Sequence, residues 1–162
     1  MIDDSGRIPI KWVKGSIALA AALAIGEGYV QTASRPLPGD RCTGGFGDAS
    51  MECGQKTTPV RALVKMIRTE QAYEKGMKQC LDPNASVYQY EWDAYADFTY
   101  NLGIGNFCHS SIPPNLNAGK NAEACSVILL YGNFHKHFEA GVYRRRVREY
   151  NTCMYGVPLI KD

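Results

Sequence analysis

The stretch from Gly28 to Lys56 constrains the fold most, because glycine and proline interrupt it too often for a helix or a long strand. Its centre is the run PLPGDRCTGGFG, residues 36–47. Glycine permits turns that other residues resist, and proline fixes the backbone and removes a hydrogen-bond donor. We therefore expect a small, irregular lobe here, with room only for short strands.

Helical patterns lie on both sides of this stretch. Residues 15–27 are strong helix formers. Thr58 followed by Pro59 is typical of a helix start, and Asp82 followed by Pro83 of an end. Apolar spacing predicts three more helices, over residues 87–101, over residues 120–131 and from about Gly141 onward, with a break from Gly103 to Pro114. The predicted fold class is α+β and mostly helical, with a small β-hairpin lobe (about residues 28–57) and a larger helical lobe (about residues 58–156).

The first 26 residues have two interpretations. Residues 1–14 have the character of a flexible leader with three basic residues, and residues 15–26 (GSIALAAALAIG) carry no charge. This uncharged run is short for a membrane span but has the length of a signal-peptide core. Cleavage there would leave Glu27 close to a new N-terminus, so we expect the segment to be retained. The alternative is an ordinary buried first helix, which leads into a domain over residues 27–162.

Six cysteines, at positions 42, 53, 80, 108, 125 and 153, show no spacing typical of a zinc site. An even count without metal spacing favours disulfides and hence an oxidising compartment; the alternative is buried thiols in a cytosolic protein. We expect Cys42–Cys53 and Cys108–Cys125 to close short loops, and Cys80–Cys153 to join the first and last helices of the helical lobe.

No metal site is expected from the histidines. His135 and His137 cannot share a helix face, and His109 is remote from them in the sequence. The chain of 162 residues is 45% hydrophobic and 21% charged, which is typical of one globular domain. Its net charge of +2 is too small to indicate nucleic-acid binding but is compatible with an anionic polymer.

Several motifs, in their order along the chain, resemble those of the phage lysozyme-like endolysins of glycoside hydrolase family 24. Glu27-Gly28-Tyr29 resembles that family's opening after the first helix, and PGDRCTGGFG (38–47) resembles its glycine-rich loop. Its later landmarks are similar to TTPVRAL (57–63), NLGIGNFCHSS (101–111), LNAGKNAEAC (116–125) and GVYRRRVREYNTC (141–153).

The resemblance implies a lysozyme-like fold and an endolysin. Such an enzyme hydrolyses the β-1,4 bond between N-acetylmuramic acid and N-acetylglucosamine of bacterial peptidoglycan during host cell lysis. It implies a monomer without metal or organic cofactor. For residues 8–26 it implies a signal-arrest-release segment, with export by the host, a transient tether in the inner membrane and release into the periplasm.

Hydrolysis of a glycosidic bond needs a protonated acid at the leaving oxygen and a second group that activates water or stabilises the transition state. Glu27 is the expected acid, because the end of an apolar helix disfavours its charged form. Asp40, in a polar loop, should stay ionised, and the Thr43 hydroxyl can hold the water of an inverting route. Asp40 lies three residues before Thr43, closer than in the common family pattern, and Pro-Gly-Asp is also ordinary turn chemistry.

Substrate contacts are implied for Gly45, Phe46, Asn101, Gly103 and Arg144, and an ion pair is implied between Arg144 and Glu27. Gly44, Gly45 and Gly47 would let the backbone approach sugar rings. A different interpretation makes Arg144, Arg145, Arg146 and Arg148 a solvated basic face that binds anionic cell wall. Two rival functions stay open: a non-catalytic peptidoglycan-binding or inhibitory module on a degenerate lysozyme scaffold, and a lytic transglycosylase, which would leave anhydro-muramic ends.

Overall fold

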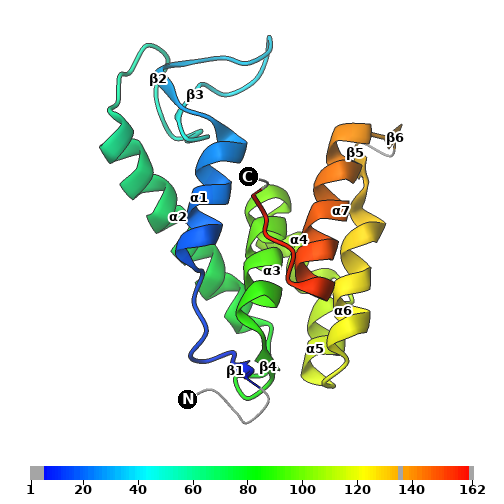
Figure 1. The fold of residues 1–162 in the computed structure, drawn as a ribbon. Coiled ribbons are helices and arrows are strands. Elements are labelled where there is room, and N and C mark those ends of the chain that lie inside the picture. Colours follow the sequence, from blue (N-terminus) through cyan, green and yellow to red (C-terminus); the bar gives the residue numbers. More distant parts are fainter. Residues whose placement is uncertain (1–5, 135–136, 161–162) are drawn as a thin grey trace. The chain divides into compact units, whose positions relative to one another are not determined.

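The computed structural model describes residues 6–134 and 137–160. The chain forms two compact units (Figure 1): unit 1 consists of Met1–Leu19 with Ala72–Asp162, and unit 2 of Ala20–Gln71. Helices α1 (Ile17–Glu27) and α2 (Pro59–Gln79) each begin in one unit and end in the other. The fold is mostly helical with small two-stranded sheets, as the sequence predicted.

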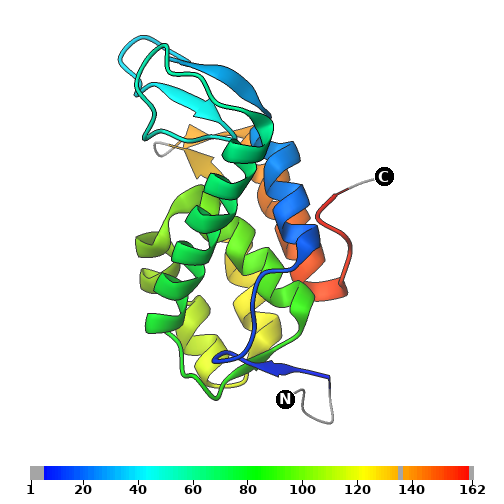
Figure 2. The ribbon, with the colours of Figure 1, turned by 90° about the vertical axis from the view of Figure 1, so that its left-hand side faces the viewer.

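Unit 2 contains the predicted β-hairpin. Strand β2 (Val30–Ser34) pairs antiparallel with β3 (Thr43–Gly45), with Val30 opposite Gly45 and Ser34 opposite Thr43, and a bulge lies between these two pairs. The two strands and the long loops beside them are visible in Figure 2. The disulfide Cys42–Cys53 joins the residue before β3 to the loop before α2, with 5.2 Å between the Cα atoms. It confirms the first predicted pair.

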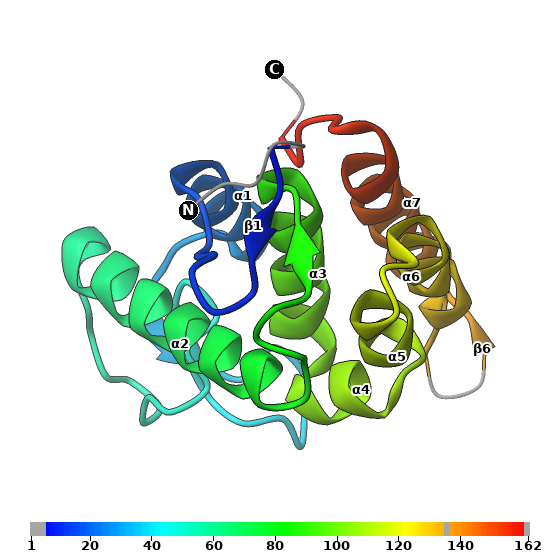
Figure 3. The ribbon, with the colours of Figure 1, turned by 90° about the horizontal axis from the view of Figure 1, so that it is seen from below.

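The helices of unit 1 surround α3 (Gln89–Leu102), whose Trp92, Tyr95 and Phe98 are completely buried. Helix α7 (Ala140–Tyr155) packs along α3 (Figure 3). The other elements of unit 1 are α4 (Ile104–His109), α5 (Ile112–Asn117), α6 (Asn121–Val127), the 3₁₀ helix η1 (Ile128–Tyr131), and strands β5 (Asn133–Phe134) and β6 (His137–Phe138).

The expected break from Gly103 to Pro114 contains two short helices, α4 and α5. Gly103 ends α3 with φ of 90° and precedes α4 directly. Pro113 and Pro114 lie in the first turn of α5. Proline is tolerated there because the first N–H groups of a helix have no partner within the helix. The two prolines therefore begin a helix here, and the predicted break is wrong at this point.

The N-terminal segment is not the flexible leader that the sequence suggested, from residue 6 onward. Strand β1 (Ile8–Pro9) pairs antiparallel with β4 (Ser86–Val87), and a turn follows in which the N–H of Val13 donates to the Pro9 carbonyl. Ile10 and Val13 are each only 1% exposed. Burial of these two side chains favours the ordered state. Residues 1–5 lie outside the described part.

Polar contacts also attach the residues between β1 and α1 to unit 1. Ser16 is the N-cap of α1, because its Oγ accepts a hydrogen bond from the Leu19 N–H at 3.1 Å. The same hydroxyl donates to Asp93 at 2.5 Å, and the Gly15 N–H donates to Glu74. Among the described residues, no helix combines the length and apolar character needed to cross a bilayer.

Two of the three predicted disulfides are wrong. The structure pairs Cys80 with Cys108 and Cys125 with Cys153, with Cα separations of 5.7 and 5.6 Å, in place of Cys108–Cys125 and Cys80–Cys153. Helix α4 packs on the last turns of α2, since a Cβ on Gly76 would come within 2.5 Å of the Ile104 side chain. One turn further along both helices, the same contact brings Cys108 to Cys80. Cys125, fully buried in α6, consequently pairs with α7.

Candidate active site

Glu27 is the last residue of α1, and glycine fixes this helix end. Gly28 has a φ of 69°, and its N–H donates to the Ala24 carbonyl at 3.1 Å. A glycine in this conformation is the usual stop signal of a helix. The apolar, alanine-rich helix therefore carries Glu27 to the start of the hairpin of unit 2, where its side chain is partly buried.

The glycine-rich loop after β3 is a closed turn. Gly44 and Asp48 exchange two backbone hydrogen bonds, with the Gly44 N–H donating at 3.1 Å and the Asp48 N–H donating back at 2.8 Å. The Asp48 carboxylate also accepts hydrogen bonds from the N–H and the hydroxyl of Ser50, at 2.9 and 2.6 Å. Paired backbone groups at both ends fix the positions of residues 45–47.

The aromatic rings of Tyr29 and Phe46 pack together and hold this loop against the start of the hairpin, two residues after Glu27. They flank the paired residues Val30 and Gly45, so the hairpin register places them opposite one another. Their ring centroids are 5.5 Å apart, and the Tyr29 hydroxyl donates to the Thr57 carbonyl at 2.8 Å. Such aromatic pairs add about 0.5–1.5 kcal/mol beyond their buried area. Phe46, predicted to bind substrate, thus also has a structural contact.

The close approaches of the loop glycines are to protein atoms. A Cβ on Gly44 would lie 2.8 Å from the Met51 sulfur, and one on Gly45 would lie 3.0 Å from the Ala62 Cβ. A Cβ on Gly47 would lie 2.7 Å from Oε2 of Glu27. Packing inside unit 2 therefore accounts for glycine at these positions, while their approach to sugar rings stays a prediction.

Asp40 and Thr43 lie on the same loop as these glycines. The Asp40 N–H donates to the Leu37 carbonyl at 3.1 Å and Gly39 has a φ of 93°, which makes residues 37–40 a turn, as Pro-Gly-Asp suggested. The backbone alone forms this turn: the exposed Asp40 carboxylate has no hydrogen-bond or ion-pair partner among the described residues. Thr43, partly buried in β3, has its hydroxyl 3.4 Å from the Arg41 carbonyl, a weak contact.

The remaining predicted residues belong to unit 1. Asn101 is exposed near the end of α3, where its side-chain oxygen accepts a hydrogen bond from Arg146 at 2.9 Å. Gly103 joins α3 to α4, and Arg144 is exposed on α7. Glu27, Asp40 and Thr43 belong to unit 2. The implied ion pair between Arg144 and Glu27 would join the two units and stays a prediction.

The four arginines of α7 do not form one solvated face. Arg146 is completely buried and donates to Glu149 at 2.6 Å, and Arg145 pairs with Asp97 of α3 at 2.9 Å. Burial raises the pKa of Glu149 and lowers that of Arg146; nearby Asp97 raises the pKa of Glu149 further. A charge run in sequence cannot reveal such burial, because one turn of a helix has both a solvent side and a core side.

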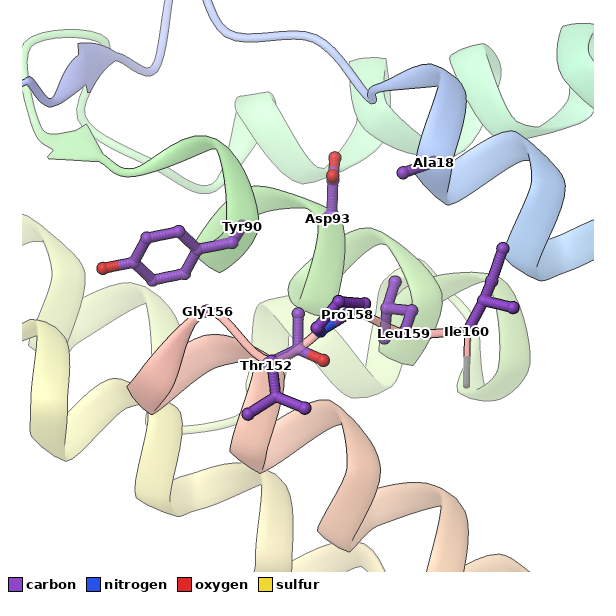
Figure 4. Close-up of a pocket in the computed structure, with 9 residues that line it drawn as sticks. Ala18, Tyr90, Asp93, Thr152, Gly156, Pro158, Leu159 and Ile160 are labelled. Atoms are coloured by element: carbon purple, nitrogen blue, oxygen red, sulfur yellow. The ribbon is translucent and has the colours of Figure 1, made fainter. Parts of the chain in front are cut away.

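Arg144 and Arg148 stay exposed, and they line a groove of about 530 Å³ beside the C-terminal segment Val157–Leu159. A second hollow, of about 210 Å³, is almost wholly apolar and contains none of the predicted site residues. The segment after α7 lines this hollow together with Tyr90 and Asp93 of α3; in Figure 4, Pro158 and Leu159 lie below Asp93, and Ile160 lies on the side of Ala18, away from Tyr90. The Asp93 carboxylate is already engaged by Ser16.

The supporting roles of Tyr29, Asp48 and Arg146 were not predicted: Tyr29 stood only in a motif, and Arg146 only in a run of basic residues. Tyr29 and Phe46 carried only a weak signal, two aromatic residues on either side of a predicted hairpin, because the bulge places Tyr29 five residues before Ser34 and Phe46 only three after Thr43. For the roles of Asp48 and Arg146 the sequence contains no such signal. Among the described residues, no group of three or more His, Cys, Asp or Glu side chains could hold a metal ion, and His135 falls outside them.

Comparison with known proteins gives consistent similarities. The family described as Phage lysozyme matches residues 25–149. An endolysin of Bacillus phage PZA is 27% identical over 135 residues, which is 82% of this chain and 52% of that protein. The chain thus spans about half the length of this curated relative.

Solved structures show the same fold. An endolysin from Escherichia coli O157:H7 phage FAHEc1 has a TM-score of 0.80 at 21% identity, covering 90% of this chain and 96% of that one. The muramidase domain of SpmX from Asticaccaulis excentricus has a TM-score of 0.74 at 25% identity, covering 88% of this chain and 98% of that one. The fold is therefore that of phage lysozymes, as the sequence predicted.

Proposed function

This chain belongs to the phage lysozyme family, and from that premise we propose that it is an endolysin that hydrolyses bacterial peptidoglycan. The proposed target is the β-1,4 bond between N-acetylmuramic acid and N-acetylglucosamine. The observation that supports this proposal most is the position of Glu27: a partly buried carboxyl group at the end of an apolar helix, beside a glycine loop closed by its own hydrogen bonds.

In the proposed reaction Glu27 is the general acid that protonates the leaving oxygen of the glycosidic bond. The acid must carry its proton when the bond breaks, and the partly buried carboxyl group of Glu27 is the group proposed to supply it. Protonation of the leaving oxygen removes the need to expel an alkoxide, and such acid catalysis contributes about 10²–10⁴-fold to the rate.

Asp40 and Thr43 act on the water in this proposal. The Asp40 carboxylate, which has no partner among the described residues, is available to accept a proton from water. The Thr43 hydroxyl has only a weak contact at 3.4 Å and is available to orient that water. An inverting reaction needs the two carboxyl groups about 6.5–9.5 Å apart, so that a water fits between the base and the sugar.

The test is an analysis of products released from purified peptidoglycan by the full chain. Hydrolysis at the proposed bond yields muramic acid with a reducing end, which borohydride converts to the alcohol before mass spectrometry. Anhydro-muramic products would instead identify a lytic transglycosylase. Sedimentation of the protein with the wall, without any soluble product, would identify a non-catalytic binding module. Either of these two results would refute the proposed hydrolysis.

We propose in addition that the protein acts as a monomer in the host periplasm after a transient inner-membrane tether through residues 8–26. The absence of charge from Gly15 to Gly26 supports membrane entry. The contacts of the folded protein support exit: a segment held in the bilayer would leave Glu74 and Asp93 without the partners that Gly15 and Ser16 provide. Each carboxylate keeps one further hydrogen bond, from Trp92 to Glu74 at 2.7 Å and from Gln89 to Asp93 at 3.0 Å, but gains those from the N-terminal segment only in the folded protein, so completion of unit 1 favours release.

A further inference from the structure

Gly47 makes the closest approach of the glycine loop to Glu27. A Cβ built on Gly47 would lie 2.7 Å from Oε2, 3.2 Å from Cδ and 3.4 Å from Cγ of Glu27. Comfortable contacts between such atoms begin at about 3.5 Å. A side chain at residue 47 would therefore occupy space that the Glu27 carboxyl group fills, along three successive atoms of that group.

The loop has little freedom to yield to such a side chain. Gly47 immediately precedes Asp48, whose backbone forms both hydrogen bonds with Gly44. Phe46, on the other side, packs against Tyr29, and Tyr29 is anchored by its hydroxyl to Thr57. The Glu27 side chain is partly exposed and has several rotatable bonds between its Cα and its carboxyl group. Of the two partners, the carboxyl group is the one that would move.

We propose that Gly47 is a positioning residue for the general acid: the missing side chain at residue 47 fixes where the Glu27 carboxyl group lies. The backbone of Gly47 forms one wall of the space that Glu27 occupies, and it blocks rotation of the carboxyl group toward the loop. This inference rests on the proposed hydrolysis with Glu27 as acid. It assigns to Gly47 a role distinct from contact with sugar rings.

The conformation of Gly47 has to be separated from its contact, because φ is 76° and any L-residue there is strained. Gly54 provides the matched control. It lies in the same unit, its φ is 82°, and a Cβ on it would meet nothing within 4 Å. Alanine at either position is strained by a positive φ of similar size, and only alanine at 47 meets Glu27.

The experiment compares Gly47→Ala and Gly54→Ala in the full chain, with kcat and KM measured on soluble peptidoglycan fragments and with thermal unfolding. The unfolding temperatures of the two variants should fall by similar amounts. Displacement of a catalytic group by about 1 Å costs up to about 100-fold in rate. We therefore expect kcat of Gly47→Ala to fall about 10- to 100-fold with KM nearly unchanged, and kcat of Gly54→Ala to stay near the parent value.

A second background tests whether the effect passes through Glu27. Glu27→Asp withdraws the carboxyl group by one carbon from the position that a Cβ on residue 47 would occupy. In that background Gly47→Ala should lower kcat much less than it does in the parent, which is the non-additivity expected of two residues in contact.

The outcomes distinguish the inference from its premise. A parent chain that does not hydrolyse the fragments refutes the proposed function. A parent that does hydrolyse them, with equal kcat for the two alanine variants, refutes the role of Gly47. A raised KM with unchanged kcat for Gly47→Ala would also refute it, because the residue would then act on substrate binding and not on the acid.

Discussion

At the scale of single residues, the carboxyl group of Glu27 can do its proposed work only when it carries a proton that it can donate to the leaving oxygen. Glu27→Gln keeps the size and polarity of the side chain and removes the acidic proton. We expect kcat to fall at least about 100-fold, with thermal unfolding near that of the parent. Turbidity loss of a cell-wall suspension measures the first, and calorimetry the second. A folded Glu27→Gln variant with a tenth of the parent activity would exclude Glu27 as the acid.

Asp40 and Thr43 are predicted to act on the water and not on the sugar in its ground state. Asp40→Asn and Thr43→Ala should each lower kcat and leave KM and wall binding nearly unchanged. Neither change should cost much stability, because the Asp40 carboxylate has no partner among the described residues and the Thr43 contact is weak. Steady-state kinetics on soluble fragments checks both. Full activity of Asp40→Asn would exclude the Asp40 carboxylate as the base, and Asp40 would then be only a residue of the turn 37–40.

At this scale the sequence located the candidates but not their neighbours. The order of the motifs singled out Glu27, Asp40 and Thr43, because motif order is a property of the sequence itself. The contact between Gly47 and Glu27 depends on the register of β2 on β3, which a bulge shifts. A bulge changes which residues face each other, and no residue type marks it in this chain.

At the scale of elements, the buried pair Arg146–Glu149 joins α7 to α3 through Asp97 and Asn101. Arg146→Met fills a similar volume but removes the 2.6 Å partner of the completely buried Glu149, which then keeps only a 3.4 Å ion pair with Arg145 among the described residues. Removing one partner of a buried pair costs about 3–5 kcal/mol, so we expect a loss of that size in the free energy of unfolding. Denaturant titration measures it.

The matched control for this prediction is Arg148→Met, two residues further along α7. The Arg148 side chain is exposed and is not part of an ion pair among the described residues. Its replacement should change the free energy of unfolding by no more than about 0.5 kcal/mol. Equal losses for the two variants would show that the pair adds nothing beyond general charge.

Elements also explain why helices were predicted better than disulfides. The helices α2, α3 and α7 lie close to their predicted ranges, because caps, prolines and apolar spacing are local signals. A disulfide depends on which helices pack together. The cysteines at 80 and 108 meet because α4 packs against α2 at Gly76, a contact between residues far apart in sequence. For the same reason β1 escaped prediction: its partner β4 lies beyond α2.

At the scale of the whole molecule, residues 8–26 are predicted to exist in two environments, the bilayer and the folded protein. Replacing Ala20, Ala21 and Ala22 with leucines should favour the bilayer, because each buried CH₂ adds about 0.8 kcal/mol. We expect a chain retained in the membrane fraction and delayed lysis of the host. Cell fractionation and the time course of lysis measure these effects.

Serines at the same three positions are the opposite control and should shorten the membrane-bound stage. Activity of the purified leucine variant on wall fragments shows whether its folded form is intact. Release of the leucine variant as fast as the parent, or a parent that is never found in the membrane fraction, would leave residues 15–26 as the first helix of the domain only.

The discontinuity of unit 1 has a consequence for the growing chain. Strand β1 is made before unit 2, and its partner β4 emerges only after all of unit 2 has been made. Unit 2 is one contiguous stretch, so its hairpin and the Cys42–Cys53 link can form while the ribosome is still translating. Ile10 and Val13, which are buried in the folded protein, follow directly on β1, and β1 stays unpaired until β4 has been made. Proteolysis of nascent chains stalled at increasing lengths should therefore show residues 20–71 protected first, and the N-terminal segment protected last.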